Sequence, residues 1–175
     1  MTSNTPFGSV DDAGRQILQL SYIGCSFRHH DAKIGDKPCG IGWVRLRKDG
    51  WASIGTSPAG TAGALTIQPL ASLRGAMGLW LNYDAGNGSL AVAVLDARTG
   101  EAIPGYEASS CDKLRGNSTS ERVNWGGARR RLPTAKGSEL SLSFKMQGSG
   151  VSLYSFALTP SRWKSDDDLF ARAYQ

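Results

Sequence analysis

Apolar and polar residues alternate along the first half of residues 139–158, ELSLSFKMQGSGVSLYSFAL. In an extended chain, one face would carry the apolar side chains of Leu140, Leu142, Phe144 and Met146. The other face would carry Ser141, Ser143 and Lys145. This period of two is typical of a β-strand with one buried face. Residues 147–150 then supply turn residues, and residues 151–158 are apolar on both faces, as in a strand covered on both sides. The pattern predicts a β-hairpin.

Short apolar runs separated by turn residues predict further strands. The runs are residues 16–24, 41–48, 51–55, 64–68, 79–84, 89–96, 103–107 and 121–125. Asp49-Gly50 and Asn87-Gly88 are strong turn pairs, so we expect a hairpin across each of them. Many short strands with turns between them are typical of an all-β fold, and we predict a two-layer antiparallel β-sandwich of jelly-roll type.

The sandwich is expected to occupy residues 15–160 as one domain. Residues 1–14 are polar and are predicted to be a flexible lead-in. In the tail, residues 161–175, Ser165 is a good N-cap, and the three aspartates after it suit the positive end of a helix dipole. The tail therefore predicts a short C-terminal helix.

Composition and charge limit the classes of partner that we expect for this chain. The 22 glycines exceed ordinary usage and favour a turn-rich β chain. No apolar run reaches the roughly 18 residues of a membrane span, and the N-terminus lacks the basic and apolar regions of a signal peptide, so we predict neither. The densest charge is Arg129–Arg131, with a second group at Arg45, Arg47 and Lys48. Without stacking aromatics beside the first group or a recognition helix, we predict a solvated basic loop and no nucleic-acid partner.

Cysteines and histidines give no clear metal or disulfide pattern. Cys25, Cys39 and Cys111 are odd in number and widely spaced, so three reduced thiols is the favoured interpretation, with a Cys25–Cys39 bridge as the alternative. His29-His30-Asp31 is interpreted as a polar loop, because adjacent residues of an extended chain point to opposite faces. We predict no cofactor; a structural calcium held by loop aspartates is conceivable but not predicted.

The loop at residues 110–120 and the aromatic residues near it form the candidate binding site. Fixed polar groups beside an aromatic face suit a sugar, whose hydroxyls need hydrogen bonds and whose ring face needs an apolar surface. The candidate ligand-binding residues are Tyr106, Asp112, Asn117 and Trp125. In the alternative interpretation, Asp112 and Asn117 cap their own loop while Trp125 belongs to the core.

No catalytic site is predicted. Glycoside hydrolysis needs two carboxylates that flank one bond. Five acidic residues are candidates, but nothing in the sequence pairs them: Asp84, Asp96, Glu107, Asp112 and Glu121.

Several motifs follow one another between residues 40 and 158. Gly40-Ile41-Gly42 precedes Leu46–Trp51, which reads LRKDGW. The later motifs are Leu65-Thr66 with Pro69-Leu70, Leu90–Ala97 with Ile103–Tyr106, Cys111-Asp112 with Leu114 and Gly116–Thr119, Val123–Trp125, and Leu153–Phe156. Together they resemble the C-terminal β-sandwich module that follows the five-bladed propeller in bacterial glycoside hydrolase family 32-like proteins of the β-fructosidase type.

The resemblance implies an accessory module rather than a catalytic one. Residues 16–24 are similar to the last propeller strand of that family, but a chain of 175 residues cannot hold five blades and the sandwich. The blades carry the family's catalytic carboxylates, so no catalytic residue is carried over. Asn117 stands where the family shows aspartate, which weakens an acid or calcium role there. The resemblance also implies a secreted or periplasmic parent protein.

We therefore expect a non-catalytic carbohydrate-binding or accessory β-sandwich module, whose partner is a glycan or a propeller-type domain. A purely structural or protein-interaction module that packs on a partner domain is the alternative. A small glycan hydrolase or lyase is a third hypothesis.

Overall fold

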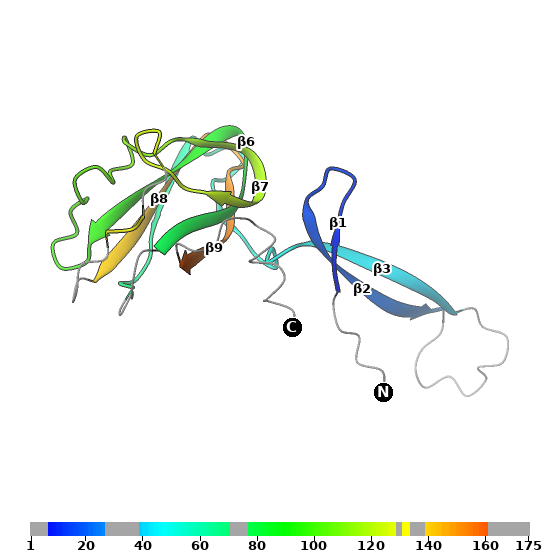
Figure 1. Cartoon of the computed structure of the whole chain (residues 1–175). Coiled ribbons are helices and arrows are strands. Elements are labelled where there is room, and N and C mark those ends of the chain that lie inside the picture. The colour runs from blue at the N-terminus through cyan, green and yellow to red at the C-terminus, as the bar shows by residue number, and fades with distance from the viewer. Residues whose placement is uncertain (1–6, 27–38, 71–76, 129–130, 134–138, 161–175) are drawn as a thin grey trace. The chain divides into compact units, whose positions relative to one another are not determined.

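The computed structural model describes residues 7–26, 39–70, 77–128, 131–133 and 139–160. Within these ranges the chain is all β, with antiparallel strands and no helix (Figure 1). It divides into two compact units, Met1–Trp51 and Ala52–Gln175. The boundary between these units falls inside the expected domain of residues 15–160. The expected C-terminal helix and the segment His29–Asp31 lie outside the described residues.

The first unit is a three-stranded antiparallel sheet of β1 (Phe7–Val10), β2 (Gln16–Cys25) and β3 (Cys39–Arg47), in that order. A turn joins β1 to β2, and the Asp11 carboxylate accepts backbone hydrogen bonds from Ala13 (3.0 Å) and Arg15 (2.8 Å) there. These bonds, first of all the one from Arg15, lower the pKa of Asp11. The expected lead-in over residues 1–14 thus contains a strand, which forms because β2 offers it a paired edge.

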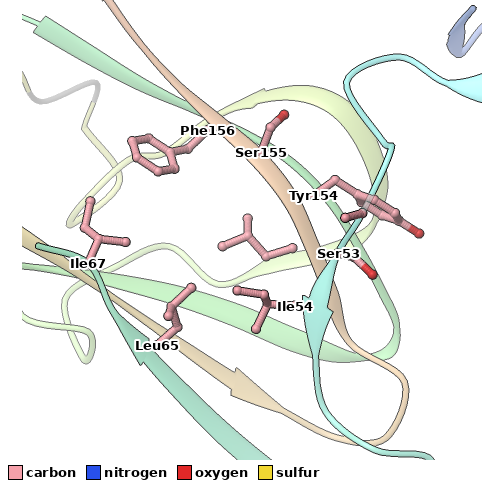
Figure 2. Close-up of a pocket in the computed structure, with 9 residues that line it drawn as sticks. Ser53, Ile54, Leu65, Ile67, Tyr154, Ser155 and Phe156 are labelled. Atoms are coloured by element: carbon pink, nitrogen blue, oxygen red, sulfur yellow. The ribbon is translucent and has the colours of Figure 1, made fainter.

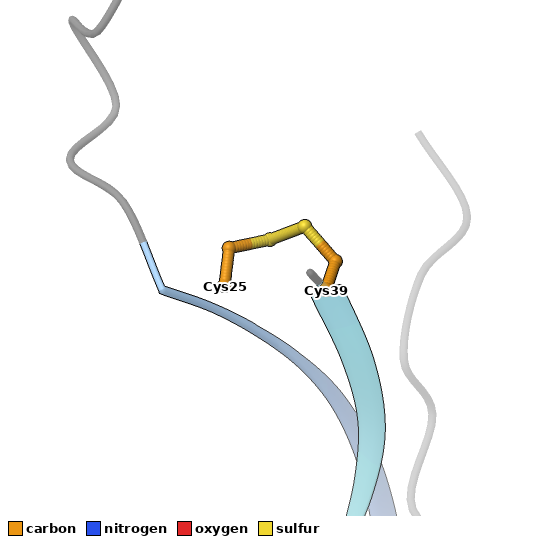
Figure 3. Close-up of a disulfide and its surroundings, with 2 residues drawn as sticks. All are labelled: Cys25 and Cys39. Carbon is orange, nitrogen blue, oxygen red and sulfur yellow. A yellow bond between two sulfur atoms is a disulfide. The ribbon is translucent and has the colours of Figure 1, made fainter. Parts of the chain in front are cut away.

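A disulfide joins Cys25 to Cys39 at the ends of β2 and β3 (Figure 3). The two cysteines lie directly opposite each other in the strand register. The favoured interpretation of three reduced thiols is therefore wrong, and Cys111 is the free cysteine. Sequence spacing could not decide this, because the pairing depends on the β2–β3 register.

The second unit is a six-stranded antiparallel sheet. Its strands are β4 (Ile54–Gly55), β5 (Ala62–Thr66), β6 (Met77–Asp96), β7 (Leu114–Arg122), β8 (Leu140–Gln147) and β9 (Ser152–Pro160). The order is β4-β9-β6-β8-β5, and β7 also pairs with β6. The long strand β6 pairs with β9 along residues 77–84 and with β8 along residues 89–96. It therefore organises the whole unit.

Three expected hairpins are wrong in their pairing. Residues 79–84 and 89–96 are two parts of β6, which continues through Asn87-Gly88 instead of turning back. β8 and β9, the expected final hairpin, do not pair with each other; each pairs with a different part of β6. After β3, the turn at Asp49 leads away from that strand, and β4 pairs with β9 instead.

Two further segments differ from the expectation. Residues 103–107 form a turn, in which Ile103 donates to the Val94 carbonyl (2.9 Å) and Val94 donates to the Tyr106 carbonyl (3.0 Å). Most of the expected loop at residues 110–120 belongs to β7. This strand carries few apolar residues and pairs with β6 through irregular register, so it lacks the alternation that marks a strand in a sequence.

The core of the second unit is continuous and apolar. Its largest fully buried side chains are Trp125, Tyr83, Phe144, Leu79, Leu81, Leu90, Leu140 and Leu142. The predicted apolar face of β8 is confirmed, but Ser141 and Ser143 on its other face are also buried. Thr66, on β5, donates a hydrogen bond to Ser143 (3.2 Å), which satisfies that hydroxyl. Within the described ranges, no helix has the length and hydrophobicity needed to cross a membrane.

Candidate functional sites

Trp125 is a core residue. Its side chain is 0% exposed, and its indole N–H donates a hydrogen bond to the Val92 carbonyl (3.0 Å). A ring with no exposed face cannot stack on a sugar, so the prediction that Trp125 contacts a ligand is wrong. The alternative interpretation of this residue is confirmed.

Tyr106 packs against the same ring. The centroids of the Tyr106 and Trp125 rings are 5.2 Å apart, and the planes are tilted by 59°. The Tyr106 hydroxyl donates to the carbonyl of Arg131 (2.6 Å). Tyr106 therefore covers the core and holds the chain near Leu132, which is itself buried.

Asp112 and Asn117 serve different segments. The Asp112 carboxylate accepts from the backbone N–H of Gly127 (3.0 Å), which fixes the turn after Trp125. Asn117 lies opposite Asp84 in the β6–β7 register, and its amide donates to that carboxylate (2.7 Å). Each of the four predicted ligand-binding residues thus has a structural contact: Tyr106 packs on Trp125, Asp112 holds the turn after Trp125, and Asn117 bonds Asp84. Because the Trp125 ring is buried, these contacts give no support to a sugar site that stacks on it.

The other candidate carboxylates also have structural partners. Asp96 accepts from the backbone N–H of Arg98 (2.8 Å), which is the main cause of its lowered pKa. Glu107 accepts from Gly105 and from the Ser110 hydroxyl (2.8 Å), and Glu121 bonds the Tyr83 hydroxyl. These contacts explain the carboxylates as parts of turns and strand pairs. In the described part of the chain, no group of three or more His, Cys, Asp or Glu residues is arranged to hold a metal ion.

An open groove of about 490 Å³ lies between β4, β5 and β9 (Figure 2). Its apolar lining is Ile54, Leu65, Ile67, Leu153 and Phe156. Ser53, Tyr154 and Ser155 also line the groove. Strands β4 and β5, the two ends of the strand order, thus both border the groove. The lining is mostly apolar, and nothing in it selects a particular ligand.

The first unit presents two chemically different faces. Residues directly opposite each other in an antiparallel sheet point to the same side, so the register assigns each side chain to a face. We call one the apolar face: Val10, Leu18, Leu20, Tyr22, Val44 and Leu46, with Gln16 and four glycines. We call the other the aromatic–arginine face: Phe7, Gln19, Ser21, Ile23, Ile41, Trp43, Arg45 and Arg47, with Ser9, Ile17 and the two cysteines.

Within the three strands the apolar face contains no charged residue, and much of it is exposed. The exposed fraction is 50% for Tyr22, 42% for Val44 and 63% for Val10. The Tyr22 ring lies over Gly42, where an added Cβ would come 2.6 Å from the tyrosine hydroxyl oxygen. Glycine at position 42 therefore lets the ring lie flat on the sheet, which extends the apolar surface.

The aromatic–arginine face combines exposed rings with a guanidinium group. Phe7 and Trp43 meet edge to face, with centroids 5.8 Å apart, and Trp43 is 57% exposed. Phe7, Gln19 and Arg45 form one row across the three strands. The strands contain neither aspartate nor glutamate, so no carboxylate on them neutralises the exposed Arg45.

Sequence reasoning identified β2 and β3 as strands but not these faces. Residues 16–24 carry apolar side chains at both odd and even positions, which is the signal of a strand covered on both sides. Among the described apolar residues of the three strands, however, only Ile17 and Leu18 are buried, so most of the sheet lacks the cover on both sides that this signal predicts.

Comparisons with family models, curated proteins and solved structures found no match to this chain. The resemblance to the family 32-like sandwich module therefore stays a prediction.

Proposed function

We propose that this chain is a non-catalytic accessory module that docks on a partner domain through the apolar face of its first unit. One observation carries the proposal: a sheet face with no charged residue in its three strands leaves Val10, Tyr22 and Val44 exposed. Tyr22 and Val44 are diagonal neighbours in the β2–β3 register, and adjoining exposed apolar side chains mark an interaction site. Of the functions expected from the sequence, this proposal keeps the accessory and protein-interaction roles.

The proposed partner is a propeller-type β domain, in the same protein or in another. The similarity of residues 16–24 to a last propeller strand supports this choice, since those residues form β2, the central strand of the sheet. For the second unit we propose the jelly-roll sandwich, with β6 passing from one layer to the other near Gly86–Gly88. The change of β6 partner from β9 to β8 at this point supports that arrangement.

The test is sedimentation velocity of the chain mixed with an isolated five-bladed propeller domain of a family 32-like protein. The test variant is Tyr22→Ser/Val44→Ser, and the matched control is Ile23→Ser, which removes an apolar side chain from the opposite face. We expect a complex with the wild-type chain. The double variant should weaken it at least tenfold, which corresponds to about 1.4 kcal/mol, and the control should leave it unchanged.

Two results would overturn the proposal. The absence of any complex at high concentration would remove the propeller-type partner. Equal weakening by the variant and the control would show that the apolar face is not the docking surface.

A further inference from the structure

We infer that the aromatic–arginine face is a binding site for a carboxylated polysaccharide. Its central residues are Trp43, Phe7, Gln19 and Arg45, and none of them was predicted as a ligand residue. The site lies on the side of the sheet opposite to the proposed docking face. It is therefore independent of the docking proposal and can be occupied while a partner covers the apolar face.

The exposed rings supply the apolar part of the site. A sugar ring presents a flat face of C–H groups, which packs on an aromatic side chain. Trp43 is more than half exposed, and the edge of one ring against the face of the other supports both Phe7 and Trp43 in place. The amide of Gln19, on the central strand between β1 and β3, adds a donor and an acceptor for hydroxyl groups.

Charge complementarity selects an acidic ligand. Arg45 follows Trp43 at the next position on the same face, about 7 Å along the strand. A guanidinium group binds a carboxylate through two parallel hydrogen bonds. The three strands carry no acidic residue, so an acidic ligand would supply the negative charge that this face lacks. An acidic sugar offers both the ring face and the carboxylate within one residue.

The geometry favours a glycan over single-stranded nucleic acid. Binding of consecutive bases uses aromatic rings that stack successive bases along a positive groove. Here the planes of Phe7 and Trp43 are 88° apart, so the two rings cannot form one continuous stack of that kind. Repulsion between arginines likewise disfavours a second copy of this face as the occupant.

The experiment is isothermal titration of the full chain with four probes. They are polygalacturonate as the acidic glycan, dextran as a neutral glycan, poly-L-glutamate as a carboxylate polymer without rings, and a thymidine oligonucleotide. We expect binding to polygalacturonate that is at least tenfold tighter than binding to the other three.

Two single substitutions test whether Trp43 and Arg45 form the binding site. Trp43→Ala and Arg45→Gln should each weaken polygalacturonate binding about tenfold. Trp51→Ala removes an exposed tryptophan outside the strands, and Arg98→Gln removes an exposed arginine from the second unit, so both are matched controls that should bind normally.

Each alternative outcome overturns the inference in a different way. Equal binding to poly-L-glutamate or to the oligonucleotide would leave a non-specific polyanion surface. Preference for dextran would remove the role of Arg45 while keeping a sugar site. Polygalacturonate binding that is unchanged in Trp43→Ala would show that the site lies elsewhere on the chain. No binding to any of the four probes would show that this face is not a binding site.

Discussion

Trp125 illustrates how one side chain joins parts of the second unit. Its indole N–H bonds the carbonyl of Val92 on β6, and its ring supports Tyr106. Trp125→Phe would remove this hydrogen bond and leave a void, so we expect a loss of about 3 kcal/mol in the free energy of unfolding. Urea denaturation measures this loss. The exposed Trp51→Phe is the control and should change stability by less than about 0.5 kcal/mol. Equal effects would contradict the core assignment.

Cys111 should behave as a protected thiol. Burial raises its pKa, so the neutral thiol is favoured in the folded state and the reactive thiolate is suppressed. The contribution of this group to stability is complete below the unfolded pKa of about 8.5 and declines as the pH rises above it. With Cys25 and Cys39 oxidised, we expect a thiol reagent at pH 8 to label one group per chain, and only after denaturant is added. Rapid labelling of the native chain would contradict this.

The contacts and exposure of single side chains were harder to predict than the positions of the strands. Polar loop residues beside aromatic ones are typical of both sugar sites and capped turns, and only the contacts of Asp112 and Trp125 distinguish the two. The exposure of Trp43 could not be predicted, because an apolar strand in a sequence does not show whether anything covers it.

The disulfide connects β2 and β3 at their last paired residues, Cys25 and Cys39. Closing a loop of about 15 residues removes roughly 3 kcal/mol of unfolded-state entropy in the simplest model. We therefore expect Cys25→Ser/Cys39→Ser to accelerate amide exchange throughout β2 and β3. Exchange in β6 and β8 is the internal control, because these strands belong to the other compact unit. Unchanged exchange in β2 and β3 would contradict this role.

The bend in β6 depends on a glycine with no room for a side chain. A Cβ at Gly88 would collide with the carbonyl of Gln147 and lie 2.7 Å from Val151 Cγ2. Gly88→Ala should therefore cost about 3 kcal/mol of stability. Gly86→Ala is the comparison: its positive φ of 50° costs about 1 kcal/mol, but open space surrounds it. Thermal denaturation of both variants measures the difference, and a larger loss at Gly86 would contradict the packing at the bend.

At the scale of elements, the positions of most strands were predictable and their partners were not. Alternation at residues 140–146 identified β8, because its apolar face lies on the core. The hairpins failed because turn residues such as Asn87-Gly88 also allow a strand to bend and continue. Polar β7 escaped detection because its pairing with β6 relies on the backbone.

The two compact units differ in how much apolar surface they bury. The second unit buries a large core around β6 and is a stable module. In the described part of the first unit, Ile17 and Leu18 are the buried apolar residues, whereas Val10, Tyr22 and Val44 on the apolar face are exposed. The exposed apolar face therefore supports the proposed role in association.

Hydroxyl-radical footprinting with mass spectrometry tests this claim most directly, because it measures the solvent exposure of individual side chains. In the free chain, Tyr22 and Trp43 should oxidise rapidly, whereas Trp125 and Tyr83 should remain protected. On addition of the propeller domain, Tyr22 should become protected and Trp43 should not, because they lie on opposite faces. Protection of Tyr22 in the free chain equal to that of Trp125 would show that the apolar face is already covered, and would contradict the account.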